Sequence, residues 1–184
     1  MTIANSSTPK TAADPLALVD VDHVRFYVGN AKQAAFFYAA NFGFTIAQRA
    51  DLTTGSRDRS RYLLTQGNIR LLLETPLHKD DPAAEELRAY GDGVKDIAFT
   101  VDDAEAAWKQ AVHNGGQSAA EPHTVSDAHG SVTTASVHTY GRVVHTFVSR
   151  TGAYAHRALR EGGLLAPGFS AMPDLAINRM NAEN

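Results

Sequence analysis

Two histidines, His138 and His145, flank a predicted turn at Tyr140 and Gly141, and such a pair could clip a metal ion or share a proton. Imidazole suits zinc, copper, iron and nickel, and it titrates near neutral pH. Residues beside a hairpin turn are more often cross-strand or surface neighbours, so we interpret this pair as structural. Five further histidines show neither H-E-x-x-H nor H-x-H spacing, and we expect them to be solvated: His78, His113, His123, His129 and His156.

Three arginines, Arg57, Arg59 and Arg61, alternate along the edge of one predicted strand. The planar guanidinium fork can hold a carboxylate through two parallel hydrogen bonds. A row of arginines is also common on a solvated or ion-paired face, and we favour that interpretation. The binding of a carboxylate remains the alternative.

The composition predicts an ordinary globular domain, since 43% of the 184 residues are hydrophobic and 20% are charged. The 17 basic and 20 acidic residues give a net charge of −3, which argues against a nucleic acid as partner. We find no run of 18 apolar residues and expect no membrane partner. The absence of cysteine excludes disulfides and zinc-thiolate sites, and it is compatible with the cytoplasmic location that we expect.

An internal repeat predicts the strands and helices that position these residues. A shift of 73 residues lays Val21–Ala35 over Val94–Trp108, and then Asn41–Gly43 over Asn114–Gly116. Seven aligned pairs are identical: Val21/Val94, Phe26/Phe99, Val28/Val101, Ala31/Ala104, Ala34/Ala107, Asn41/Asn114 and Gly43/Gly116.

Each copy predicts one strand, one helix and three further strands. The first strand alternates apolar and polar residues, and a helix begins after Asn30 or Asp103 and is closed by Gly43 or Gly116. Gly67-Asn68 and Tyr140-Gly141 supply turns between the last strands. We predict these later strands at about 44–52, 59–65, 69–74, 118–125, 131–138 and 143–150.

The predicted organisation has four parts. Residues 1–18 form a flexible arm, and residues 19–152 form one domain with modules at about 21–77 and 94–150. A short connecting helix is expected at about 82–90, and residues 153–184 are expected to form an extended carboxy-terminal tail. The fold class is α+β, built from two tandem βαβββ modules.

Paired βαβββ modules resemble the vicinal oxygen chelate superfamily, the glyoxalase fold, in which a cupped mixed sheet has its helices outside. Several strings resemble the amino-terminal half of the 4-hydroxyphenylpyruvate dioxygenase family, with hydroxymandelate synthase as a less similar cousin. These strings are V-G-N-A-K-Q-A-A-F-F-Y (Val28–Tyr38), G-S-R (Gly55–Arg57), Q-G-N-I-R-L-L-L (Gln66–Leu73), G-D-G-V-K-D-I-A-F (Gly91–Phe99), H-T-Y-G-R-V-V-H-T-F-V (His138–Val148) and L-L-A-P-G-F (Leu164–Phe169).

The resemblance implies an Fe(II) enzyme that uses O2 to convert the aromatic 2-oxo acid 4-hydroxyphenylpyruvate to homogentisate in tyrosine catabolism. Its iron is held by two histidines and one carboxylate, which the resemblance places in the family's carboxy-terminal half. No position here matches those ligand motifs, so no catalytic or cofactor-binding residue is assigned. We expect this stretch to be a non-catalytic amino-terminal domain that docks on an iron-bearing half or forms a homo-oligomer.

In the wider superfamily, metal ligands lie on the inner faces of the first and last strands of each module. His23, Glu74 and Asp96 fall at such positions, and the 73-residue shift places the fourth at Phe147, which cannot bind a metal. We interpret the three as a packed polar patch inside the cup. A small metalloenzyme that uses them, and a free-standing binding protein like the bleomycin resistance proteins, are the alternatives.

The predicted first helix and its exit are unusually aromatic, with Phe36, Phe37, Tyr38, Phe42 and Phe44 within nine residues. One small helix face does not need so many rings for its core. We therefore expect some of them to cover an interface, with either a missing half or another subunit.

Overall fold

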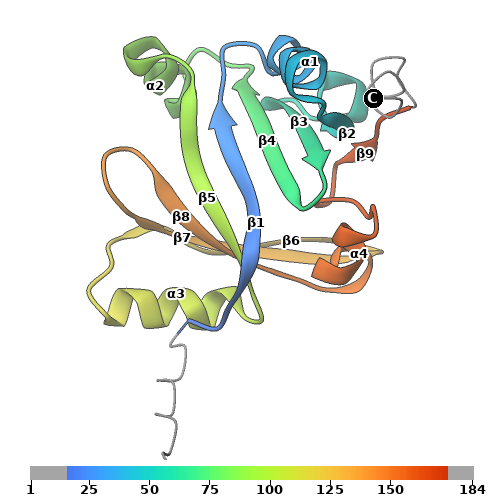
Figure 1. The fold of residues 1–184 in the computed structure, drawn as a ribbon. Helices are drawn as coiled ribbons and strands as arrows, with labels where there is room; N and C mark the ends of the chain where they lie inside the picture. The colour runs from blue at the N-terminus through green and yellow to red at the C-terminus, as the bar shows by residue number, and fades with distance from the viewer. Residues whose placement is uncertain (1–15, 174–184) are drawn as a thin grey trace, which may run out of the picture.

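The computed structural model describes residues 16–173 and is built around two adjacent strands, β1 (Leu18–Tyr27) and β5 (Gly93–Val101). These strands pair antiparallel with each other. β1 also pairs in parallel with β4 (Ile69–Pro76), and β5 pairs in parallel with β8 (Val144–Arg150). The sheet has nine strands in the order β6-β7-β8-β5-β1-β4-β3-β2-β9. The two modules therefore meet through their first strands, and the sheet curls into a cup (Figure 1).

Each module has the predicted order of strand, helix and three strands, which confirms the α+β fold of two βαβββ units. α1 and α3 lie outside the cup, one on each module (Figure 1). α2 connects the modules. The remaining elements are α1 (Ala31–Phe42), β2 (Thr45–Ala50), a 3-10 turn (Leu52–Thr54), β3 (Arg59–Gln66), α2 (Pro82–Tyr90), α3 (Ala104–His113), β6 (Ser118–Asp127), β7 (Gly130–His138), a second 3-10 turn (Gly152–Tyr154), α4 (His156–Arg160) and β9 (Ser170–Ala171).

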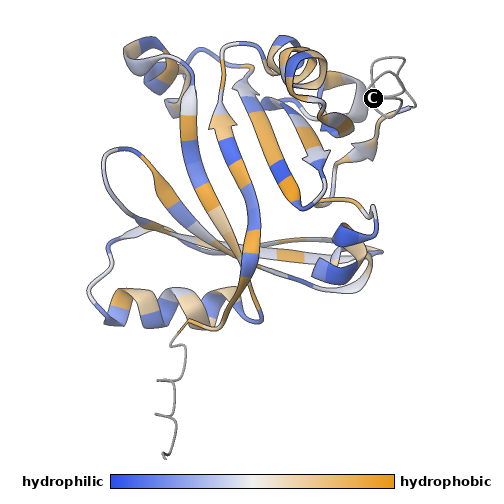
Figure 2. Ribbon diagram, viewed as in Figure 1, coloured by the Kyte–Doolittle hydropathy of each residue, from blue (hydrophilic) through white to orange (hydrophobic). Residues whose placement is uncertain are grey.

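Hydropathy alternates along β1 and β5, as Figure 2 shows, and this alternation assigns the two faces of the central strands. Even-numbered Val24, Phe26 and Val28 face α1, where they pack with Ala35 and Ala39 in the largest core cluster. The odd-numbered His23 and Arg25 face the cup. Burial of the apolar face fixes the register, because a slip by one residue would exchange the two faces.

The helix starts were predicted correctly. The Asn30 side chain accepts a hydrogen bond from the backbone N–H of Gln33 at 3.0 Å, and Asp103 caps α3 in the same way. Gly43 closes α1 with a left-handed φ of 76°. The end of α3 differs from the prediction, because Asn114 is its cap. Gly116 has another reason to be glycine, since a Cβ there would lie 2.9 Å from the carbonyl oxygen of Ala111.

The last strand of the second module is shifted by one residue relative to the sequence repeat. Phe26 pairs with Leu73, and its equivalent Phe99 pairs with Phe147, so the offset between β4 and β8 is 74 rather than 73. The structural equivalent of Glu74 is therefore Val148. Phe147 packs in the cluster with α3, outside the cup, so the prediction that it occupies an inward position was wrong.

The segment after β8 returns across the cup, although we expected it to be extended. Leu159 of α4 and Leu165 are buried against Leu63 and Leu72, on the inner side of the first module. Gln48 of β2 holds this segment by accepting from the N–H of Leu165 at 2.8 Å and donating to the carbonyl of Gly163 at 2.9 Å. β9 then adds to the sheet edge beside β2. The arm and tail beyond these elements, residues 1–15 and 174–184, lie outside the described residues.

Candidate functional site

The inner face of the cup encloses a cavity of about 380 Å³ that both modules line. His23 and Arg25 reach it from β1, Glu74 from β4 and Asp96 from β5. The structure therefore brings the three candidate ligands His23, Glu74 and Asp96 to one cavity. What they can do depends on the partners that each of them already has.

Glu74 is almost fully buried and is held by arginines. Arg61 Nε donates to its Oε2 at 2.7 Å, and Arg59 Nη1 donates to Oε1. Burial raises the pKa of Glu74, but the charges of Arg25, Arg61 and Arg59 outweigh burial and hold the pKa below its ordinary value. Glu74 is therefore a carboxylate whose oxygens are both engaged by guanidinium groups.

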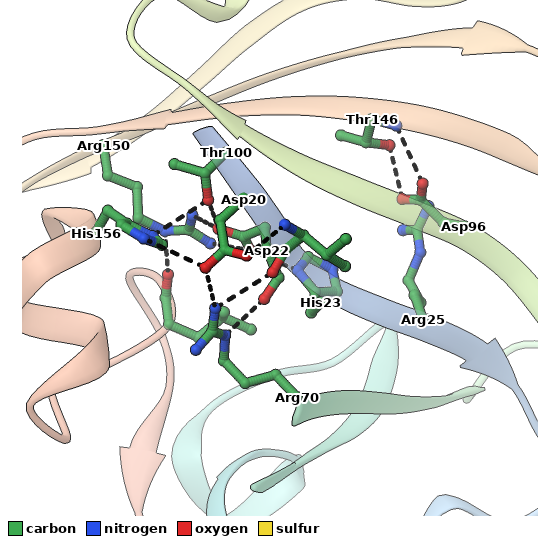
Figure 3. Close-up of polar contacts among 12 residues, drawn as sticks. Asp20, Asp22, His23, Arg25, Arg70, Asp96, Thr100, Thr146, Arg150 and His156 are labelled. Atoms are coloured by element: carbon green, nitrogen blue, oxygen red, sulfur yellow. Dashed lines mark hydrogen bonds and ion pairs between the residues drawn. The ribbon is translucent and has the colours of Figure 1, made fainter. Parts of the chain in front are cut away.

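Asp96 is also buried and fully partnered. Its Oδ2 accepts from Thr146 Oγ1 at 2.6 Å and from Arg25 Nη2 at 3.1 Å, and its Oδ1 accepts from the backbone N–H of Thr146 at 3.1 Å. Figure 3 shows this group to one side of the cup. These bonds tie β5 to β8 in the second module and to β1 in the first.

His23 lies beside a second buried carboxylate, Asp22, with its Nδ1 at 2.6 Å from Asp22 Oδ1. Arg150 Nη2 donates to Oδ1 of Asp22 at 2.9 Å and Nη1 donates to Oδ2, while Thr100 Oγ1 donates to Oδ2 at 3.0 Å (Figure 3). Burial raises the pKa of Asp22, but the hydrogen bond with His23 and the charge of Arg150 lower it by more. The pKa of Asp22 therefore lies well below the usual range.

Comparison with a family profile identifies the fold. Residues 20–140 match the glyoxalase/bleomycin resistance protein/dioxygenase superfamily. The chain belongs to this superfamily. The match runs from the first strand into the second module and so includes the positions of His23, Glu74 and Asp96.

Within the superfamily, the chain is similar to 4-hydroxyphenylpyruvate dioxygenases, over their amino-terminal portion. It is 43% identical to the enzyme of Yarrowia lipolytica over 152 residues, which are 80% of this chain and 36% of the relative. It is 40% identical to the enzyme of Tetrahymena thermophila over 83% of this chain and 37% of the relative. The chain therefore spans well under half the length of these relatives.

Solved structures give the same fold. A variant of 4-hydroxymandelate synthase from Streptomyces coelicolor superposes with a TM-score of 0.69 and 26% identity, over 85% of this chain and 43% of that one. Methylmalonyl-CoA epimerase from Mycobacterium tuberculosis superposes with a TM-score of 0.58 and 19% identity, over 76% of this chain and 92% of that one. At 19% identity, the similarity to the epimerase supports the fold assignment and nothing about function.

The dioxygenase family uses Fe(II), but the superfamily cup of this chain does not fit a metal ion. The oxygens of Glu74 and Asp96 are occupied by arginine and threonine donors, and Val148 stands at the fourth inward position. Within residues 16–173, no three His, Asp or Glu side chains are grouped so that they could hold a metal. Guanidinium groups here supply the positive charge that a metal cation would bring. We therefore assign no reaction step that uses iron to this cup.

His138 and His145 are not brought together. His138 is opposite Val144 and His145 is opposite Val137 in the β7–β8 ladder, which places the two imidazoles on opposite faces of the sheet. His145 lies beside the ring of Phe99, with centroids 5.2 Å apart. The two side chains therefore do not form a metal clip with each other.

One histidine expected to be solvated is not. His156 is partly buried, with its Nδ1 at 3.2 Å from Thr100 Oγ1 and its Nε2 at 3.7 Å from Asp20 Oδ2. Burial and the charge of Arg160 lower its pKa. The prediction failed because α4 folds back onto β1, a long-range contact with no local sequence signal. The other four lie on the surface: His78, His113, His123 and His129.

The arginine row is mainly ion-paired, as we favoured. Arg59 donates two hydrogen bonds to Asp81, from Nε to Oδ2 at 3.0 Å and from Nη2 to Oδ1 at 2.8 Å. It also donates one to Glu74. Arg61 bonds Glu74. Arg57 differs, because it is exposed and donates to the carbonyl of Leu52 at 3.2 Å.

Three residues of the cup were missed by sequence reasoning: Asp22, Arg25 and Arg150. Arg25 carried a signal, since it shares the inward face with His23 in the predicted alternation. Asp22 did not, because a register shift between Val21 and His23 interrupts that alternation. Arg150 is the final residue of the last predicted strand, and it pairs with Asp22, which lies 128 positions earlier in the sequence.

Proposed function

We propose that this chain is the non-catalytic amino-terminal domain of a 4-hydroxyphenylpyruvate dioxygenase, which supports an iron-bearing half. The observation that carries the proposal is the arginine-held Glu74 in the cup, where a metal-dependent member needs an open carboxylate. The identity of about 40% to such dioxygenases over most of this chain supports the family assignment. The complete enzyme would be cytoplasmic and convert 4-hydroxyphenylpyruvate and O2 to homogentisate.

The surface of α1 supports docking on that half. Phe36, Phe37 and Phe42 are 40%, 54% and 55% exposed, far more than a helix needs for its own core. Ala31, Ala35 and Ala39 already fill the inward stripe of α1. The relatives named above extend well beyond the matched segment, so their remaining portion is the occupant that we propose for this aromatic face.

The test is oxygen consumption by the purified chain with Fe(II), ascorbate and 4-hydroxyphenylpyruvate. We expect no turnover, because the carboxylates of the cup are already bound to arginines. Turnover that is lost in a His23→Ala variant would overturn the proposal and establish the alternative, a small metalloenzyme that uses His23, Glu74 and Asp96.

A further inference from the structure

The lining of the cup cavity is of two chemical kinds. Apolar side chains come from the second module and the returning segment: Val125, Val132, Val148, Leu165 and Phe169. Arg25 and Arg61, whose charges act on Glu74, also line the cavity. A volume of about 380 Å³ is near the lower end for small-molecule pockets, so it suits a ligand of about one aromatic ring.

The two arginines retain donors that the described residues do not use. Arg61 makes a single hydrogen bond within residues 16–173, from Nε to Glu74, which leaves both terminal nitrogens unbonded there. Arg25 makes one from Nη2 to Asp96, and the rest of its guanidinium makes none. Their side chains are 26% and 25% exposed, so both can be reached from the cavity. Arginine stays protonated, and its donors favour an anionic acceptor.

A second hollow, of about 340 Å³, adjoins the cavity, since Arg61 and Phe169 line both. The loop Gly55–Asp58 and the segment Pro167–Phe169 line this hollow. Arg61 therefore stands where the two spaces adjoin.

We propose that the cup binds a small aromatic monocarboxylate. Its carboxylate accepts hydrogen bonds from the terminal nitrogens of Arg61 and Arg25, and its ring lies against Val132, Val148 and Phe169. This site needs no metal and no catalytic step, and it stands independently of the role proposed above. The same carboxylate chemistry was the alternative that the arginine row suggested in the sequence.

Isothermal titration calorimetry of the full chain tests this site with 4-hydroxyphenylacetate, and with 4-hydroxyphenethyl alcohol as its uncharged match. We expect saturable binding of the acid with one site per chain, and at least about tenfold weaker binding of the alcohol, since hydrogen bonds to an ionised group are about twice as strong as neutral ones. Arg61→Gln should weaken acid binding by a similar factor. Arg142→Gln, at an exposed arginine stacked on Tyr90, should leave it unchanged.

A second variant blocks the space without touching a charge. Thr134 lines the cavity on β7 and is only partly buried, so Thr134→Phe fills the cavity with a residue that suits a strand. It should abolish binding while the thermal unfolding transition remains cooperative. Equal binding of acid and alcohol, or unchanged affinity in Arg61→Gln or Thr134→Phe, would overturn the proposal. Absence of any saturable heat would do so too, and none of these outcomes affects the oxygen consumption test.

Discussion

The two modules share one backbone plan and differ in where they place charge and aromatic surface. Inside the cup, the first module has Glu74 with its arginines, whereas the second has Val148 at the equivalent position. Outside, α1 exposes Phe36 and Phe37, and the repeat aligns these with Lys109 and Gln110 of α3. The two modules therefore share the fold, and only the first combines an arginine-held glutamate inside the cup with exposed aromatic rings outside it.

On the inner face of the second module, neutral hydroxyl groups join β7 and β8. Ser136 and Thr146 hydrogen-bond each other at 2.8 Å, and Thr146 also donates to Asp96. Such a ladder joins strands without an array of charges. The arginine cluster of the first module is therefore a property of that module and not a requirement of the fold.

The largest effect should come from the ion pair that joins the modules, between Asp22 of β1 and Arg150 at the end of β8. Arg150→Met leaves a buried carboxylate without its cation, so the free energy of unfolding should fall by about 3–5 kcal/mol. Urea denaturation measures this. Arg157→Met, at an exposed pair within α4, should change it by less than about 0.5 kcal/mol. Equal effects of the two changes would show that the buried pair does not join the modules.

Glu74→Gln should lower the free energy of unfolding by a smaller amount, about 2–3 kcal/mol. Arg59 and Arg61 lose their carboxylate partner in this variant, but they keep partial access to solvent. The same urea measurement applies. Glu121→Gln, on the exposed face of β6, is the matched control and should be near neutral. If Glu74→Gln were equally neutral, the charged interior of the first module would be dispensable for stability.

Acid should weaken the fold through these same carboxylates. The folded-state pKa values of Asp22 and Glu74 lie below their ordinary values, so their stabilisation is complete above about pH 5 and is lost as pH falls through about 4 and below. The free energy of unfolding measured from pH 6 to pH 3 should fall more steeply for the native chain than for Arg150→Met, in which Asp22 has lost its main cationic partner. Parallel curves would contradict this assignment.

The smallest effect on stability is expected from exchanging the outer face of α1 for that of α3. The double variant Phe36→Lys with Phe37→Gln should change the free energy of unfolding by less than about 0.5 kcal/mol for each residue, because both side chains are exposed. It should lower the fluorescence of the apolar dye 8-anilinonaphthalene-1-sulfonate bound to the folded chain. Lys109→Ala on α3 should leave the dye signal unchanged. A large loss of stability would instead assign these rings to the core.

Local patterns predicted the strands and the helix starts, since each depends on residues close together in sequence. Asn30 and Asp103 cap their helices as expected, and His23, Glu74 and Asp96 do face one cavity. The failures involve long-range or irregular features. The one-residue shift that replaces Phe147 by Val148 arises between the helix and last strand of the second module, and the Asp22–Arg150 pair joins residues 128 positions apart.

The central claim is that arginines, and not a metal ion, neutralise the carboxylates of the cup. Equilibrium dialysis of the purified chain against Fe(II) under argon, followed by elemental analysis, tests it most directly. We predict no stoichiometric iron in the native chain, and no difference between the native chain and His23→Ala. One tightly bound iron per chain, lost in His23→Ala or Glu74→Gln, would contradict the claim and make the cup a metal centre.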